Sequence, residues 1–351
     1  MNDNIKGFSW LKALLIFGII LIFVAAFLSY KAYTIFYKSN VNLKGEKSTS
    51  IYIPTNSKFD DVTEILNKKE IIINVSSLKW LAEYKNYIKN VKPGKYKISA
   101  GMNNNDLLNM LKSGRQEPVK LVFNNVRTKY QLAGKISKQL EADSLSIIKL
   151  LNDSNYLSNY DFTTYNAVVV FIPNTYQFFW NTSASELFKR MNKEYEAFWN
   201  KERKSKAEEI GLNPAQVTIL ASIVQEETNK YDEMPIVAGL YINRLKKDMK
   251  LEADPTVKFA IGDFGLKRIL KSHLKIDSPY NTYLNHGLPP GPISLPNSKI
   301  IDKTLNYTKH HYIYMCAKED FSGYHNFAVT GSEHAANARR YQNALNRLKI
   351  K

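Results

Sequence analysis

One long apolar run stands near the N-terminus of the chain. From Ala13 to Leu28 no side chain is charged or strongly polar. Trp10 and Tyr30 flank the run, and amphipathic aromatic residues favour the interface between membrane and water. The pattern therefore predicts a transmembrane helix over residues 13–30. A cleaved signal peptide is the alternative, but no clean cleavage site of small residues follows, so we expect a retained anchor.

Beyond this run, short apolar patterns predict a small mixed module and a second segment of similar kind. Alternating apolar residues predict strands, whereas apolar residues three and four positions apart predict helices. The predicted elements are a strand at 51–53 that ends before Pro54, a helix at 59–66, a strand at 94–98, a helix from 105 to Gly114, a strand at 119–123 and a helix at 130–140.

A strong helix start lies in the middle of the chain. Asn213 is a good N-cap, Pro214 occupies the first helical position, and Gln216 follows three residues after the cap. The apolar pattern then continues without interruption. We expect one helix from this start through Glu226 and Glu227.

The apolar positions of this helix place one carboxylate toward the core. At about 100° per residue, Leu220 and Val224 lie on an apolar arc that includes Glu227, whereas Glu226 falls on the opposite edge. Burial raises the pKa of a carboxyl group, so the group stays protonated near neutral pH, as a general acid must. Glu227 is thus the candidate acid. A structural ion pair with an arginine such as Arg244 is the alternative.

Composition allows a folded core and narrows the chemistry. The chain has 351 residues, 44% of them hydrophobic, which predicts about two globular domains. Its single cysteine, Cys316, excludes an intrachain disulfide and a cysteine-based zinc site. The six histidines form no His-Glu-x-x-His motif, and neither a Walker-type loop nor a Gly-x-Ser-x-Gly elbow is present. We expect neither a metal ion nor another cofactor.

The net charge of +17 suits an anionic partner such as nucleic acid, acidic lipid or a cell-wall polymer. A lysine-rich surface that only solvates the fold would give the same number. Charge alone leaves both interpretations open.

Loops rich in Gly, Pro, Tyr and Asn follow the central helix, notably at 278–283 and 287–293. Gly and Pro fix backbone directions, while Tyr and Asn offer a flat apolar face and hydrogen bonds. That combination suits the binding of a sugar ring.

Six stretches, in this order and spacing, make the chain resemble the YceG-like family of endolytic murein transglycosylases. The resemblance covers nearly the whole chain. The stretches are ASIVQEET at 221–228, INRL at 242–245, DPTV at 254–257, SPYNTY at 278–283, GLPPGPI at 287–293, and GYHNF at 323–327 with Glu333 and His334 after it.

The resemblance implies a fold and an activity. The family has an N-terminal span, a LysM-like module where residues 53–114 lie, and a segment like that at 171–176. Its enzymes cleave the MurNAc–GlcNAc bond of peptidoglycan without water, using one carboxyl group as acid and then as base, and leave a 1,6-anhydro-MurNAc end. The family's catalytic glutamate directly precedes the Thr of the first stretch, which makes it Glu227 here. Many members have Glu in place of Gln225 and Lys in place of Glu226, so no role is carried over to these two positions.

Five further residues are candidates for binding the glycan. Tyr280, Asn281 and Thr282 lie together in the tyrosine-rich stretch and are assigned to holding the sugars and stabilising an oxocarbenium-like transition state. Asn243 and Arg244 are assigned to the same site, where we favour ordering of the site over contact with sugar.

A second reaction stays open. Most glycoside hydrolases need a second carboxylate as base or nucleophile. Asp254, itself a candidate substrate-binding residue, and the nearby Glu252 and Glu233 are available for that role, so a hydrolytic muramidase is one alternative. A non-catalytic, membrane-tethered wall-binding scaffold is another, and the intact Glu227 counts against it.

We therefore predict an α+β protein in the cell (inner) membrane, with its catalytic domain in the periplasm or cell exterior. Expected partners are peptidoglycan glycan strands, the membrane and peptidoglycan synthases, but not nucleic acid. The predicted divisions are a tail at 1–12, a transmembrane helix at 13–30, a linker at 31–49, a LysM-like module at 50–115, a connecting α+β segment at 116–193 and a catalytic domain at 194–351.

Overall fold

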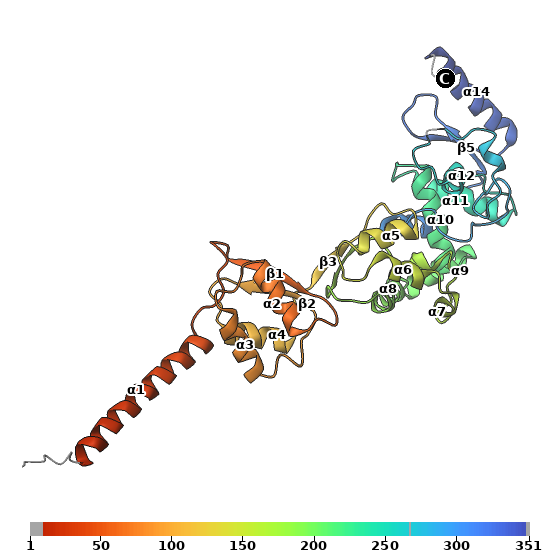
Figure 1. Ribbon diagram of the computed structural model, residues 1–351. Coiled ribbons are helices and arrows are strands. Elements are labelled where there is room, and N and C mark those ends of the chain that lie inside the picture. The colour runs from red at the N-terminus through yellow and green to blue at the C-terminus, as the bar shows by residue number, and fades with distance from the viewer. Residues whose placement is uncertain (1–9, 267, 349–351) are drawn as a thin grey trace, which may run out of the picture. The chain divides into compact units, whose positions relative to one another are not determined.

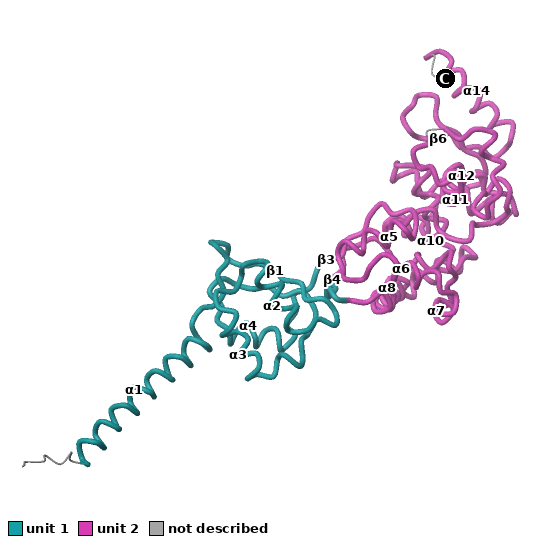
Figure 2. The backbone as a smooth tube through the Cα atoms, viewed as in Figure 1, with its two compact units in different colours: residues 1–119, 178–181 teal, residues 120–177, 182–351 magenta. Residues whose placement is uncertain are grey.

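The computed structural model describes residues 10–266 and 268–348. The chain forms two compact units (Figure 2). Unit 1 comprises residues 1–119 and 178–181, and unit 2 comprises residues 120–177 and 182–351. The predicted connecting segment and the predicted catalytic domain thus lie mainly in unit 2. They are joined there because helix α10 (Pro214–Glu227) packs against elements of the connecting segment and of the predicted catalytic domain.

Unit 1 begins with helix α1 (Trp10–Phe36), which contains the predicted span at 13–30. This helix of 27 residues is long and apolar enough to cross a membrane, and none of its residues is buried. An apolar helix whose whole circumference is exposed suits a lipid environment.

A small α+β module follows α1 in unit 1 (Figure 1). The strands β1 and β2 pair antiparallel, with Ile51 opposite Tyr96 in the buried centre of the module. The predicted strands and helices at 51–53, 59–66, 94–98 and 105–114 are confirmed, whereas α3 had no counterpart in the sequence analysis. Likeness to a LysM domain stays a prediction. The elements are β1 (Ser48–Ile53), α2 (Phe59–Lys68), α3 (Val75–Tyr84), β2 (Gly94–Ser99) and α4 (Asn104–Ser113).

The segment at 31–49 differs from the expected linker. Helix α1 continues through Phe36, and Asn40 and Val41 are buried in the module. Asn40 Nδ2 donates a hydrogen bond to Asn104 Oδ1 at 2.6 Å. The polar, lysine-rich composition of residues 37–50 predicted a linker, but an asparagine whose polar atoms are hydrogen-bonded can be buried in a core.

The first part of unit 2 confirms the two elements predicted after residue 115. Strand β3 pairs with β4 in a two-stranded sheet, and the helix expected at 130–140 is α5, which ends earlier. The elements are β3 (Val119–Val122), α5 (Lys129–Ile136), α6 (Ser144–Leu151), α7 (Ser154–Ser158), a 3-10 helix η1 (Ala167–Val170), β4 (Thr175–Phe178), α8 (Ala184–Phe198) and α9 (Lys201–Ile210).

Helix α10 is the centre of unit 2, where it contacts α9, α11, α12 and α13. Strands β5 and β6 form an antiparallel pair next to α14. Helices and short antiparallel pairs make the fold α+β, as predicted. The remaining elements are α11 (Met234–Lys246), α12 (Asp254–Ile261), a 3-10 helix η2 (His273–Lys275), α13 (Ser298–Leu305), β5 (Tyr314–Ala317), β6 (His325–Ala328) and α14 (Gly331–Arg347).

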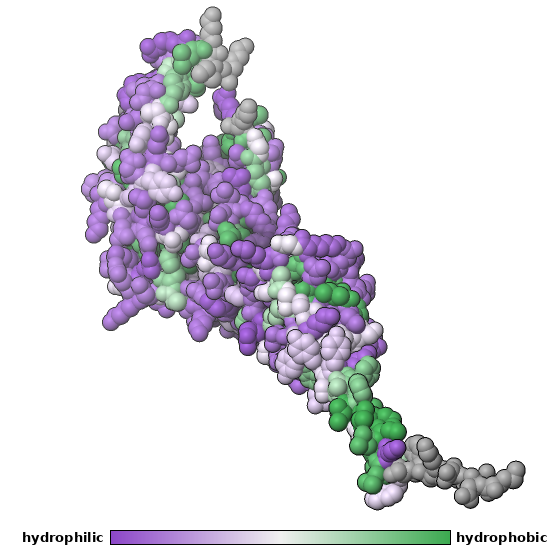
Figure 3. All heavy atoms as spheres, turned by 90° about the vertical axis from the view of Figure 1, so that its left-hand side faces the viewer, coloured by the Kyte–Doolittle hydropathy of each residue, from purple (hydrophilic) through white to green (hydrophobic). Residues whose placement is uncertain are grey.

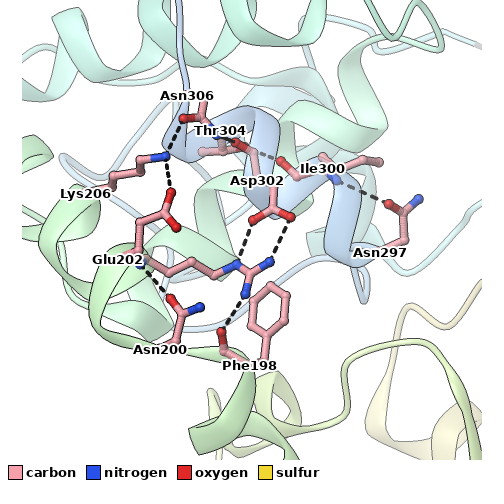
Figure 4. A network of polar contacts seen from close by, with 10 residues as sticks. Phe198, Asn200, Glu202, Lys206, Asn297, Ile300, Asp302, Thr304 and Asn306 are labelled. Carbon is pink, nitrogen blue, oxygen red and sulfur yellow. Dashed lines mark hydrogen bonds and ion pairs between the residues drawn. The ribbon is translucent and has the colours of Figure 1, made fainter.

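A polar network joins α9 to α13, two of the helices that hold α10 (Figure 4). Arg203 binds Asp302 through two hydrogen bonds of 2.7 and 3.1 Å and also donates to the Phe198 carbonyl at 2.9 Å. Lys206 bridges Glu202 and Asn306 beside it. Bidentate pairing with arginine fixes direction as well as distance, so the network sets the position of α13 against α9.

Candidate active site

Helix α10 carries Glu227 as its last residue. The predicted start is confirmed: Asn213 Oδ1 accepts from the Gln216 N–H, and Gln216 Oε1 accepts from the Asn213 N–H, each at 2.9 Å. The expected apolar arc is wrong in one respect, since every residue at 217–224 is buried. Because α10 is surrounded by other helices, the position of Glu227 is decided by where the helix ends rather than by one face.

The Glu227 carboxyl group is partly buried and hydrogen-bonded. The hydroxyl of Tyr241, a buried residue of α11, donates to Glu227 Oε1 at 2.6 Å. Burial raises the pKa of Glu227 to about 7; the Tyr241 hydrogen bond and the charge of His325 oppose this rise, and the charge of Asp254 adds to it. A carboxyl group with this pKa is substantially protonated at neutral pH and can act as a general acid.

Two cavities share Glu227 and Asp254 in their walls. The first, of about 750 Å³, combines aromatic residues such as Phe259 with cations such as Lys258. The second, of about 480 Å³, is lined by Tyr283, Tyr241 and two histidines of the C-terminal region, together with apolar residues such as Leu240. Glu227 therefore faces both cavities.

Asp254 is the first residue of α12 and is exposed to solvent. Its Oδ1 accepts a hydrogen bond from the Tyr283 hydroxyl at 2.7 Å, and burial together with this carboxylate raises the pKa of Tyr283. Tyr283 therefore stays a neutral donor, and Asp254 is a carboxylate that faces the same cavities as Glu227.

The two other carboxylates considered for the second role are paired elsewhere. Buried Glu233 accepts from the backbone N–H of His325 at 2.7 Å and lies 2.9 Å from its Nδ1. Burial raises the pKa of Glu233, but hydrogen bonds from His325 and Thr228 outweigh burial and hold the pKa below its ordinary value. Glu252 forms an ion pair with Arg244. These contacts favour Asp254 over both as a reacting group.

Asn281 and Thr282 are buried and organise the loop that carries Tyr283. Asn281 Nδ2 donates to the carbonyls of Leu274 and Ile276 at 3.0 and 2.8 Å. The Thr282 hydroxyl accepts from the Ala253 N–H at 3.0 Å, next to Asp254, and also contacts the Thr256 hydroxyl. Their hydrogen bonds assign both residues a positioning role, and contact with glycan stays a prediction.

Asn243 and Arg244 hold the chain segment that enters β5. Asn243 Nδ2 donates to the carbonyls of His310 and Tyr312 at 2.8 and 3.1 Å. Arg244 donates from Nη1 to the Ile313 carbonyl at 2.9 Å and lines the second cavity. These bonds favour the ordering role that we assigned to the pair from sequence.

Tyr280 packs its ring 4.6 Å from that of Phe259, centroid to centroid, and burial raises the pKa of Tyr280 to about 12. A Cβ at Gly291 would lie 2.2 Å from the Tyr165 carbonyl oxygen and 2.8 Å from the Tyr280 hydroxyl, so glycine is required there. Tyr280 supports the aromatic wall from behind Phe259, which itself faces the first cavity.

A profile of the YceG-like family matches residues 51–340. The chain belongs to the YceG-like family. A protein of Bacillus subtilis (strain 168) named endolytic murein transglycosylase is 28% identical over 320 residues, covering 86% of this chain and 88% of that protein. A protein of the same name from Streptococcus pneumoniae (strain D39) is 25% identical over 313 residues, covering 79% of this chain and 55% of that protein. Among solved structures, the 2.6 Å crystal structure of a putative YceG-like protein from Listeria monocytogenes matches with a TM-score of 0.54 and 28% identity, covering 83% of this chain and 98% of that one.

Some residues of this YceG-like site had no role in the sequence analysis. Tyr241 directly precedes the stretch at 242–245, and Tyr283 and His325 lie inside quoted stretches, so motif position was an available signal for them. The placement of Glu226 on an opposite edge is wrong. It forms an ion pair with Arg127 at 2.8 Å and lines the first cavity and a third one of about 610 Å³.

Proposed function

We propose that this chain is a membrane-anchored endolytic lytic transglycosylase that cleaves the MurNAc–GlcNAc bond of peptidoglycan strands and leaves 1,6-anhydro-MurNAc ends. The observation that carries the proposal is the raised pKa of Glu227 where two cavities meet. Membership of the YceG-like family and the names of the similar proteins support this class of enzyme. Cutting within strands would help to set their length.

In the first step, Glu227 acts as the acid. Because Tyr241 donates to Oε1, the acidic proton belongs on Oε2. This proton passes to the glycosidic oxygen as the bond from that oxygen to C1 of MurNAc breaks. The GlcNAc side leaves with a free hydroxyl, and positive charge develops at C1. The carboxylate of Asp254 would stabilise that charge, while Tyr283 keeps Asp254 in place.

In the second step, the same carboxyl group acts as the base. The Glu227 carboxylate takes the proton of the MurNAc C6 hydroxyl while that oxygen forms a bond to C1. Glu227 is thereby returned to its protonated form. Attack within one sugar has the advantage of proximity and requires no ordered water. Asn281, Thr282, Asn243 and Arg244 would position the loops around these groups.

Hydrolysis is the competing reaction, and the position of Asp254 on both cavities is the observation that favours it. An Asp254 carboxylate that activates water would make the enzyme a muramidase. A non-catalytic scaffold has less support, since a carboxyl group with a pKa of about 7 serves catalysis better than structure.

Product analysis tests the proposal. Purified glycan strands should yield new MurNAc ends that are one water lighter than a hydrolysed end, resist borohydride reduction and carry no oxygen-18 from labelled solvent. Reducible ends that carry the label would instead show a muramidase. Glu227→Gln should abolish cleavage, whereas Glu209→Gln, at an exposed position of α9, should leave it unchanged. Turnover by the Glu227→Gln variant would contradict the assignment.

Helix α1 supports a single-pass location in the cell (inner) membrane. Because the substrate lies outside the cytoplasm, the catalytic unit would face the periplasm or cell exterior. Peptidoglycan synthases, which make the strands that this enzyme would cut, are its proposed protein partners.

A further inference from the structure

An exposed aromatic cluster stands where α1 meets the module of unit 1. Trp80 and Tyr84, both on α3, stack with ring centroids 5.7 Å apart and an interplanar angle of 4°. Phe36, the last residue of α1, points its ring edge-on to both, at 6.2 and 5.9 Å. Trp80 is 49% exposed and Tyr84 is 67% exposed. Large aromatic side chains gathered at the surface of a protein mark an interaction site.

The end of α1 is joined firmly to this module. Asn104, the first residue of α4, donates from Nδ2 to the carbonyl of Ile35 at 2.9 Å. Ile35 and Phe36 pack against the module core. The helical hydrogen bonds continue past Phe36, because the N–H of Tyr37 donates to the Tyr33 carbonyl at 2.9 Å. The aromatic cluster therefore keeps a fixed height relative to the apolar span.

That height matches the interface of a bilayer. With 27 residues and a rise of about 1.5 Å per residue, α1 is about 40 Å long. A bilayer including both headgroup regions is about 40–45 Å thick. When Trp10 lies in one headgroup region, Phe36 lies in the opposite one. Trp80 and Tyr84 contact Phe36, so they lie at the same level.

The side chains around the cluster also suit lipid headgroups. Tyr33 on α1 and Tyr37, directly after its last residue, are exposed and extend the aromatic surface. Exposed lysines lie near the cluster residues in the sequence, at Lys31, Lys38 and Lys79. Tyr and Trp place an apolar ring and a polar atom at membrane interfaces, and lysine is attracted to anionic lipid. Figure 3 shows the hydrophobic surface of α1 running into side chains of intermediate hydropathy where the helix reaches the module.

We propose that this aromatic surface, formed by Phe36, Trp80 and Tyr84 with Tyr33 and Tyr37, seats the module of unit 1 on the headgroup region of the membrane that α1 spans. The proposal rests on the membrane anchoring in the proposed function. Lipid is favoured over glycan as the occupant because Phe36 belongs to the spanning helix itself. The seat would hold the module at the membrane surface, so the anchor would set its orientation as well as its location.

Tryptophan quenching in the full chain tests the seat. The protein is reconstituted in phosphatidylcholine–phosphatidylglycerol vesicles with or without lipids brominated near the headgroup. Trp10→Phe removes the tryptophan at the other end of α1, which leaves Trp80, Trp180 and Trp199. We expect brominated lipid to quench part of the emission of this variant, and Trp80→Phe added to it to abolish that quenching. Equal quenching with and without Trp80 would overturn the proposal.

Two controls separate the possible failures. Flotation with vesicles after an alkaline wash tests the anchor alone, so a chain that does not float contradicts the membrane anchoring rather than only the seat. A chain that floats but shows no Trp80 quenching contradicts the seat alone. Quenching of Trp80 by a labelled soluble glycan, without quenching by brominated lipid, would assign the surface to glycan and overturn the proposal. Far-ultraviolet circular dichroism verifies that each variant is folded.

Discussion

At the scale of single residues, opposing influences set the acidity of Glu227. Burial raises its pKa and the negative charge of Asp254 adds to this, while the Tyr241 hydroxyl and the charge of His325 stabilise the carboxylate. The resulting pKa of about 7 lets one group donate a proton and then accept one in the same pH range. Replacing Tyr241 or Asp254 should therefore move the pKa of Glu227 without removing the acid.

The pH dependence of kcat/KM tests this balance. Activity should fall as pH rises through about 7, because Glu227 must start protonated. Tyr241→Phe removes a donor to the carboxylate, so the fall should move to higher pH. Asp254→Asn removes a like charge, so the fall should move to lower pH. Tyr130→Phe, at an exposed position on α5, is the control and should not move it. An identical profile in all variants would contradict the assignment of Glu227 as the titrating acid.

Stability should respond to the same residue. The pKa of folded Glu227 lies above the ordinary value of 4.5, so its contribution to stability is fully present below pH 4.5 and is lost as pH rises through about 7. In Glu227→Gln the glutamine cannot ionise. We expect this variant to match the parent near pH 4 and to exceed its free energy of unfolding by about 1–3 kcal/mol at pH 8. Thermal denaturation of both proteins at both pH values measures the difference. If the variant gained no stability over the parent between pH 4 and pH 8, the prediction would be contradicted.

At the scale of elements, the site depends on how closely α11 approaches the segment before β5. A Cβ at Gly239 would lie 2.4 Å from the Thr308 carbonyl oxygen and 2.8 Å from His310 Nε2. The same segment receives the hydrogen bonds of Asn243 and Arg244. Glycine in the middle of α11 thus lowers the intrinsic stability of the helix but allows the close packing.

Gly239→Ala should lower the free energy of unfolding by about 1–3 kcal/mol, because the added methyl group must displace backbone. Turnover should fall as well, since the displaced segment supports the second cavity. The control is Gly134→Ala on α5, where a Cβ meets nothing within 4 Å. That variant should be unchanged or up to about 1 kcal/mol more stable. Chemical denaturation of both variants measures the contrast, and equal effects would show that the close approach is unimportant.

At the scale of the whole molecule, the apolar helix α1 and the candidate site belong to different units. Glu227, Tyr241 and Asp254 all lie in unit 2, whereas α1 lies in unit 1. Yet the end of α1 completes the module of unit 1 through Ile35 and Phe36. We therefore expect the apolar stretch of α1 and its last turn to have separate roles.

Two truncations distinguish these roles. A chain without residues 1–28 keeps Ile35 as the acceptor of Asn104, whereas a chain without residues 1–38 loses it together with the packing of Phe36. We expect both to cut solubilised glycan strands, and the shorter chain to show a lower melting temperature for unit 1. Differential scanning calorimetry and a turnover assay measure the two effects. Loss of turnover in the longer truncated chain would contradict the separation.

The sequence by itself determined the features that depend on neighbouring residues. Asn213 and Pro214 predicted the start of α10 because a cap bonds to backbone only three positions away. Gly114 predicted the end of α4 and indeed adopts the left-handed conformation at its C-cap. The apolar run predicted, from its length alone, a helix long enough to cross a membrane, and α1 is such a helix; that it spans a membrane stays a prediction. Glu227 could be singled out because the order of the motifs marks it, and its role as the acid stays a prediction.

Tertiary structure alone decided which groups surround Glu227. Tyr241 and His325 reach the site from other elements, and Arg127 is paired with Glu226 across a long stretch of sequence. Helical periodicity misplaced Glu226 because it assumes one buried face, whereas α10 is enclosed by several helices. The polar, lysine-rich composition at 37–50 likewise hid the burial of Asn40, whose hydrogen-bond partners lie far along the chain. Local patterns set the elements, but a pKa and a cavity depend on contacts between distant residues that form only when the chain folds.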